Sequence, residues 1–145
     1  MIEKTVENWH KLLRGELEGG LDAILADDVV FYSPIVFSPQ KGKAITKLYL
    51  EAAFATLAGD PDADSGESRE TQESKKFRYA KEVISGNHAF LEFETHAAGK
   101  YINGVDIISC NDAGLISEFK VMIRPLQAVN LLHQQMATML EKMQA

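Results

Sequence analysis

The sequence has little of several features that mark large functional classes. A single cysteine, Cys110, excludes an internal disulfide and is typical of a reducing compartment. Acidic residues outnumber basic ones, and the net charge of −6 leaves no basic footprint for nucleic acid. No apolar run is long enough to cross a membrane, and the first residues lack the charged-then-apolar order of a signal peptide. We therefore expect a soluble, cytoplasmic protein that binds neither nucleic acid nor membranes.

The motifs of the common cofactor-dependent and nucleophilic enzymes are also missing. The sequence contains no phosphate-binding loop, no dinucleotide fingerprint and no nucleophile elbow. Its four histidines do not have metal-ligand spacing, so we expect neither a metal nor a cofactor. Cys110 has no histidine partner in its part of the sequence, which favours a core or interface thiol. Any chemistry must therefore come from carboxylates, hydroxyls and aromatic side chains.

The composition that remains is that of one globular domain covering residues 1–145. The sequence is 46% hydrophobic and 25% charged, and its length is sufficient for a real core. One stretch, 59–76, has no large apolar residue, so we expect a mobile loop there. A lid over a ligand is the alternative interpretation of this loop.

Apolar residues at helical spacing predict helices at both ends of the chain and before the loop. The segments end at breaker residues: Gly19-Gly20 after the first helix, Asp27-Asp28 after the second, and Ser33-Pro34 after the short strand. The helices are expected at 2–17, 21–25, 43–57 and 126–143, with a short strand at 29–32. The C-terminal helix is rich in methionine, which indicates packing over the sheet or across a dimer.

The second half of the chain reads as an antiparallel meander. Strands are expected at 77–84, 89–97, 101–110 and 115–123, joined by short turns that contain Gly86, Gly99 and Gly114. Asp106 does not fit this pattern, because it is a carboxylate inside an apolar strand. It is either a pocket acid or a structural acid that a neighbouring Trp, Tyr or Ser satisfies.

This order predicts an α+β protein in which a cone-shaped, curved antiparallel sheet wraps around the N-terminal helices and a C-terminal helix follows. Residues 25–45 and 105–116 resemble the nuclear transport factor 2-like (SnoaL-like) superfamily, which has this cystatin-like α+β roll. The resemblance implies a conical cavity and a homodimer formed through the outer face of the sheet. It does not fix an activity, because the superfamily holds several kinds of enzyme and plain binding modules.

The nearest local resemblance is to ketosteroid isomerases. It implies that Asp106 takes the place of the oxyanion-binding aspartate, Trp9 that of a tyrosine on the first helix, and Ser33 that of the catalytic base. Ser33 cannot abstract a proton near neutral pH without a helper base. The indole N–H of Trp9 is a weaker oxyanion partner than a phenol. The resemblance therefore supports the pocket and argues against the isomerase reaction itself.

The resulting hypothesis is a SnoaL-like pocket protein that holds a small, largely apolar molecule. If it is an enzyme, it is a cofactor-free isomerase, cyclase or dehydratase that uses acid–base chemistry, and Asp106, Tyr32 and Ser33 are the expected catalytic residues. The alternative is a non-catalytic dimeric binding or interaction module of the same fold. The residues expected to line the pocket are Trp9, Phe54, Leu91, Phe93, Phe119 and Val121.

Overall fold

The computed structural model describes residues 1–58 and 76–144. The helices are α1 (Ile2–Leu13), α2 (Leu21–Ile24), α3 (Lys43–Leu57) and α5 (Leu126–Gln144). The strands are β1 (Leu25–Tyr32), β2 (Gln40–Lys41), β3 (Arg78–Ser85), β4 (His88–Ala97), β5 (Lys100–Cys110) and β6 (Ile116–Arg124). The loop predicted at 59–76 lies, up to residue 75, outside the described residues.

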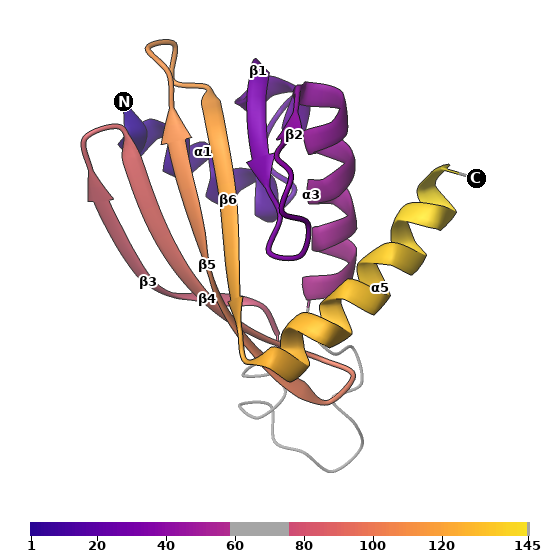
Figure 1. The fold of residues 1–145 in the computed structure, drawn as a ribbon. Coiled ribbons are helices and arrows are strands. Elements are labelled where there is room, and N and C mark those ends of the chain that lie inside the picture. The colour runs from indigo at the N-terminus through magenta and orange to yellow at the C-terminus, as the bar shows by residue number, and fades with distance from the viewer. Residues whose placement is uncertain (59–75, 145) are drawn as a thin grey trace.

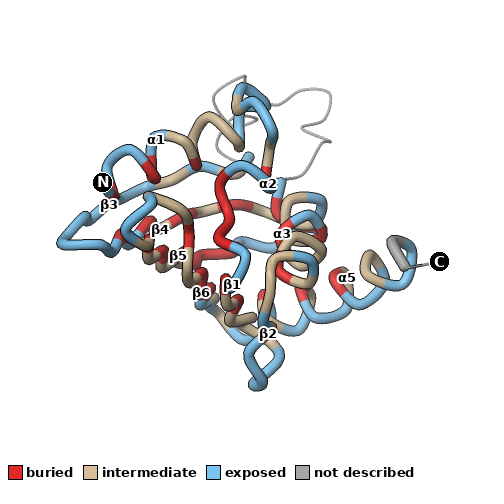
Figure 2. Tube along the Cα trace, turned by 90° about the horizontal axis from the view of Figure 1, so that it is seen from above, coloured by how far each residue is buried: buried red, intermediate tan, exposed pale blue. Residues whose placement is uncertain are grey.

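The described strands form one curved sheet in the order β2-β1-β6-β5-β4-β3. Strands β3 to β6 pair antiparallel as a meander, whereas β1 runs parallel to β6. Helices α1 and α3 lie on the concave side of the sheet, and α5 extends from the end of β6 alongside α3 (Figures 1 and 2). The predicted α+β class with a curved sheet, N-terminal helices and a C-terminal helix is confirmed.

The core lies between the concave face of the sheet and α1 and α3. On β4, β5 and β6 the residues of one face are buried and those of the other face are less so, as a strand period of two requires, with the exception of Asn103 on β5. Asp106 falls on the inward face of β5, in register with Leu91 of β4 and Val121 of β6. At Gly104 a Cβ would lie 2.5 Å from the Phe93 ring, so glycine lets that ring pack against the strand. The acid is thus placed in the apolar interior by strand alternation alone.

Two N-terminal boundaries differ from the prediction. Helix α1 ends at Leu13 instead of residue 17, because Gly15 adopts a φ of 72°. Its N–H bonds the carbonyl of Leu12, and the N–H of Glu16 bonds the carbonyl of Lys11, which together form a Schellman cap. Strand β1 begins at Leu25 instead of residue 29, so the aspartate pair expected to end α2 lies on the strand as exposed residues.

Helix α5 closes one end of the cone. It follows the cis peptide bond before Pro125 and buries Ala128, Leu132 and Met136 against the rest of the core. Its other faces are polar or partly exposed. Of the helices that the structure describes, none has the length and apolar character needed to cross a bilayer. The apolar side chains of α5 therefore form part of the wall of the interior. The convex face of the sheet is not covered by any of the described helices (Figure 1).

Candidate functional site

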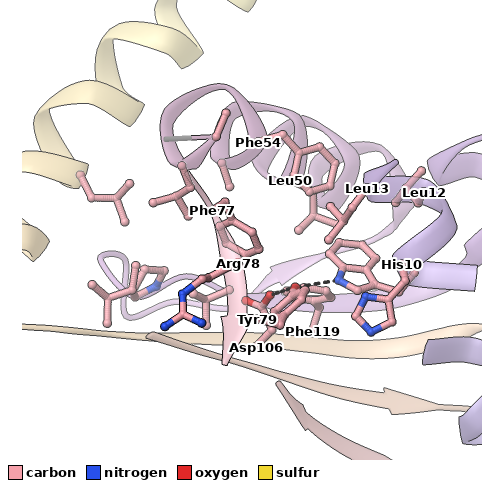
Figure 3. A pocket seen from close by; sticks show the side chains of 18 of the residues that line it. His10, Leu12, Leu13, Leu50, Phe54, Phe77, Arg78, Tyr79, Asp106 and Phe119 are labelled. Atoms are coloured by element: carbon pink, nitrogen blue, oxygen red, sulfur yellow. Dashed lines mark hydrogen bonds between the residues drawn. The ribbon is translucent and has the colours of Figure 1, made fainter. Parts of the chain in front are cut away.

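A pocket of about 550 Å³ lies between α1, α3, α5 and the concave face of the sheet. This volume falls within the range of about 300–1,000 Å³ that is usual for small-molecule sites. Its wall is mainly apolar and aromatic, as the close view shows (Figure 3). The apolar side chains that line it include Leu12, Leu13, Phe31, Leu50, Phe54, Phe77, Phe119, Val121, Ile123, Leu132 and Met136.

A chain of hydrogen bonds links three pocket residues from different elements. The indole Nε1–H of Trp9, on α1, donates to the hydroxyl oxygen of Tyr79, on β3, at 2.8 Å. The Tyr79 hydroxyl in turn donates to Oδ2 of Asp106, on β5, at 2.5 Å. Figure 3 shows these bonds inside the pocket as dashed lines. The carboxyl group is therefore held by a phenol that is itself held by an indole.

Aromatic packing fixes the two donors. The Trp9 ring is 1% exposed and lies against Phe54 and Phe119, with ring centroids 5.7 and 4.9 Å away. The Tyr79 ring makes an edge contact with Phe77 at 5.0 Å. Because rings packed in this way have few alternative rotamers, both polar groups point in fixed directions. The pocket therefore presents a preorganised polar site in an otherwise apolar wall.

Burial alters the acidity of the two oxygen groups. Asp106 is 6% exposed, and loss of solvation raises the pKa of its carboxyl to about 7, although the hydrogen bond from Tyr79 acts in the opposite direction. Burial also raises the pKa of the Tyr79 hydroxyl well above its ordinary value, with the neighbouring Asp106 charge as a further cause. Near neutral pH, Asp106 therefore exists in both protonated and ionised forms, while Tyr79 stays protonated.

This arrangement suits proton donation to a ligand oxygen. A carboxyl group has two oxygens, and the described residues contribute one hydrogen bond to Asp106, at Oδ2. Asp106 also lines the pocket, so its remaining hydrogen-bonding capacity is available to a bound molecule. In the protonated form it can donate to a carbonyl or hydroxyl oxygen, and in the ionised form it can accept a proton.

The structure brings together most of the residues expected in the pocket. Asp106, Trp9, Phe54, Phe119 and Val121 all line it. The other two expected wall residues, Leu91 and Phe93, share the concave face but are fully buried and do not line the pocket.

The aromatic residue that precedes β3 explains this difference for Phe93. The Phe77 ring stacks on Phe93 with a centroid separation of 5.0 Å and forms part of the pocket wall. Phe77 thus takes the place at the wall that the sequence assigned to Phe93.

The structure does not bring Tyr32 and Ser33 to the pocket wall, contrary to the expectation that they position a substrate. By strand alternation Tyr32 lies on the face opposite Phe31, and its ring lies 4.8 Å from Nζ of Lys120. The hydroxyl oxygen of Ser33 accepts hydrogen bonds from the backbone N–H groups of Ile35 and Val36. The next residue, Pro34, does line the pocket.

Tyr79 is the residue that sequence reasoning missed. The prediction allowed for an Asp106 satisfied by a neighbouring Trp, Tyr or Ser but did not say which. The signal was the pair Phe77 and Tyr79, which places two aromatic rings on one face of the predicted strand at 77–84. His10 was also missed; it lines the pocket, and its Nε2 bonds a carboxylate oxygen of Glu82.

The outer face of the same strands carries a second, shallower hollow. It encloses about 350 Å³ and is lined by Val83, Phe90, Val105 and Met122, among others. Three of these side chains are large, apolar and exposed: Val83 at 51%, Phe90 at 42% and Met122 at 52%. Within residues 1–58 and 76–144 there is no cluster of three or more His, Cys, Asp or Glu side chains that could hold a metal ion.

Comparison with known proteins links this fold to a recognisable group. No protein-family model and no curated protein sequence matches the chain. A steroid delta-isomerase from Pseudomonas aeruginosa superposes with a TM-score of 0.81 at 25% identity, covering 97% of this chain and 92% of that one.

Two further crystal structures extend this likeness. A cystatin-like-fold protein from Silicibacter pomeroyi gives a TM-score of 0.73 at 25% identity over 92% of this chain and 83% of that one. A nuclear transport factor 2-like protein of unknown function from Mesorhizobium loti gives 0.62 at 16% identity, covering 86% and 91% of the two chains.

Proposed function

Because the chain belongs to the nuclear transport factor 2-like (SnoaL-like) superfamily, we propose that it holds a small, largely apolar molecule in the pocket around Asp106. The single observation that supports this proposal is a buried carboxyl that lines an aromatic pocket and receives, from the described residues, one hydrogen bond, from Tyr79. A purely structural acid would be surrounded by partners on all sides. The apolar wall binds the body of the ligand, and Asp106 orients its oxygen-bearing end.

The chemistry we propose is cofactor-free acid–base catalysis: an isomerisation, a cyclisation or a dehydration. In its protonated form Asp106 donates a proton to a carbonyl or hydroxyl oxygen of the ligand. The resulting carboxylate then accepts the proton that a ligand carbon loses, so the acid is regenerated in each cycle. Tyr79 holds the carboxyl in place, and Trp9 orients Tyr79. The hydroxyl of Ser33 is engaged by two backbone N–H groups, so we assign no base role to it.

The first experiment measures binding of 2-acetylnaphthalene, a neutral apolar ketone, by fluorescence and calorimetry. Substitution Ala53→Trp places a ring in the pocket from α3 and should abolish binding. Ala55→Trp, on the exposed side of the same helix, is the matched control and should bind normally. Equal affinity in both variants would show that the ketone binds elsewhere.

The second experiment follows the carboxyl carbon of Asp106 by NMR titration. We expect a pKa near 7 in the free protein and a higher value with the ketone bound, because a hydrogen bond to the ligand favours the protonated form. An ordinary pKa of about 3.9 that does not change on adding the ketone would refute the role of Asp106.

A second proposal is a homodimer formed through the outer face of the sheet, where Val83, Phe90 and Met122 are exposed. Charged residues of both signs, Lys81, Glu92 and Arg124, line the same hollow and permit pairing with a second copy of the face. Light scattering of the wild-type protein and of Met122→Glu tests this. We expect dimers that the substitution converts to monomers; a wild-type protein that stays monomeric at high concentration would contradict the proposal.

A further inference from the structure

Basic side chains outnumber acidic ones among the residues that line the pocket, whereas acidic residues outnumber basic ones in the sequence as a whole. The sequence has 21 acidic and 15 basic residues, yet Asp106 is the one carboxylate among the described lining residues. Three strong bases line the same pocket: Arg14, which follows α1, Lys76, which precedes β3, and Arg78, its first residue. We call these three the rim cations, because their side chains are largely exposed whereas Asp106 is buried. A negative protein thus places positive charge around its apolar cavity.

The rim cations have hydrogen-bonding capacity that the protein does not use. Arg78 donates through one Nη to Glu94 at 2.9 Å, and Arg14 donates through Nε to Glu16 at 2.5 Å. A guanidinium has five N–H donors, so each arginine retains others. The side-chain ammonium of Lys76 is exposed and makes no hydrogen bond or ion pair with the residues that the structure describes. Neither glutamate is among the lining residues.

The pocket therefore has two polar ends of different character. One is the Trp9–Tyr79–Asp106 chain in the buried wall, which fits a neutral oxygen. The other is the set of rim cations, which fits a negative charge. Between them the wall is apolar. Tyr79 points from β3 to Asp106, whereas the adjacent Arg78 leaves the other side of the strand and lies at the edge of the pocket (Figure 3). A ligand that satisfies both ends has an apolar body with a neutral oxygen group on one side and an anion on the other.

We propose that the pocket selects amphipathic ligands that carry an anionic group, such as a carboxylate, and that Lys76 and Arg78 bind this group at the rim. This inference rests on the proposed function, because it requires an apolar ligand in the cavity. The guanidinium of Arg78 matches the geometry of a carboxylate, and Lys76 adds a second positive charge. The anion stays near solvent, so it does not incur the full cost of desolvating a charge.

The test uses two probes with the same skeleton, 2-naphthylacetate and its neutral amide, 2-naphthylacetamide, titrated into the protein of residues 1–145 at low salt. We expect the wild type to bind the acetate about tenfold more tightly than the amide. The preference should fall with added salt, because exposed charges are screened. Each of Lys76→Gln and Arg78→Gln should reduce the preference about threefold, and the double variant should abolish it.

Three further variants make the result specific. Lys41→Gln removes a positive charge on β2, outside the pocket, and should keep the preference. Glu94→Gln breaks the same ion pair as Arg78→Gln but keeps the arginine, so the preference should be kept or increased. Asp106→Asn leaves the rim cations unchanged and removes a carboxyl that is partly ionised near neutral pH, so the preference should be kept or increased.

The outcomes separate this inference from the proposed function. If the acetate and the amide bind equally well, the anionic selectivity is refuted while the apolar pocket stands. If the preference disappears in Asp106→Asn, the anion is bound at the buried acid and the rim assignment is overturned. If neither probe nor 2-acetylnaphthalene binds, the proposed function fails, and this inference fails with it.

Discussion

Asn103 and Asp106 are three residues apart on β5, on opposite faces of the sheet, and both are almost fully buried, at 7% and 6% exposure. Asn103 makes three hydrogen bonds: its amide donates to Oε2 of Glu92 and to the carbonyl of Phe93, and its oxygen accepts from Nε of Arg124. Asp106 receives one, from Tyr79, within the described part of the chain. The two residues are therefore equally buried, but Asn103 has three hydrogen bonds where the described residues give Asp106 one.

The difference separates a structural polar residue from a candidate functional one. Burying a polar group is costly unless partners replace water, and Asn103 has a full set of partners. Asp106 has fewer partners, faces a cavity and has a raised pKa instead. The partners of Asn103 are fixed by the sheet, whereas the remaining partner of Asp106 is left to a ligand. Four predictions test this comparison.

The largest expected effect is on the pH dependence of stability. The pKa of Asp106 is about 7 in the folded protein and lies above its ordinary value, so the native state binds this proton more tightly than the unfolded state does. Its contribution to the free energy of unfolding is fully present below about pH 4 and is lost as the pH rises to about 7. The loss is at most about 4 kcal/mol, since each pKa unit is worth about 1.4 kcal/mol.

Urea denaturation from pH 4 to pH 8 measures this contribution. Asp106→Asn should remove the loss of stability between these pH values and should be more stable than the wild type at pH 8. Asp28→Asn, an exposed carboxylate on β1, should keep the wild-type profile. If the wild type and Asp106→Asn had parallel profiles, Asp106 would not be the titrating group.

Asn103→Ala should have the next largest effect. The substitution removes three hydrogen bonds and leaves the buried carbonyl of Phe93 without its side-chain donor, which should cost about 2–3 kcal/mol of unfolding free energy. Ligand affinity in the pocket should stay the same, because Asn103 lies on the outer face. A large loss of 2-acetylnaphthalene binding in a folded Asn103→Ala variant would show that the two faces are coupled.

The contrast between these two residues also shows what the sequence could predict. Strand alternation and turn residues were enough to predict the meander and to place Asp106 on the apolar face of its strand. The partner of Asp106 could not be predicted in the same way, because Tyr79 and Asp106 are 27 residues apart and meet only through the register of β3, β4 and β5.

Other residues were predicted in the wrong place for a similar reason, because their position depends on contacts between elements. Leu91 and Phe93 have the right period for the pocket wall, but a sequence does not show that Phe77 covers Phe93. The rim cations were missed because they lie beside segment ends, where the direction of a side chain depends on the path of the neighbouring loop. Periodicity therefore predicts which face a residue belongs to, and the register between elements decides which residues meet.

Tyr79→Phe tests how the residue that hydrogen-bonds Asp106 acts on it. Removing the hydroxyl deletes two hydrogen bonds and should cost about 1–2 kcal/mol of unfolding free energy. It should also raise the pKa of Asp106 above 7, because the bond from Tyr79 lowers it in the native protein. NMR titration of the carboxyl carbon measures the shift. Tyr49→Phe, on α3, is the matched control and should leave this pKa unchanged, and a lower pKa in Tyr79→Phe would contradict the proposed geometry.

The smallest effect is expected for Ser33→Ala, which decides whether Ser33 is structural or catalytic. The hydroxyl oxygen accepts from two backbone N–H groups of the turn that follows β1, so its loss should cost about 1 kcal/mol of unfolding free energy. Because Ser33 does not line the pocket, the affinity for 2-acetylnaphthalene and the pKa of Asp106 should stay at their wild-type values. Ser33→Thr keeps an acceptor oxygen and should restore part of the lost stability. If Ser33→Ala instead weakens binding at unchanged stability, the residue acts on the ligand, and the site extends past Pro34 to the end of β1.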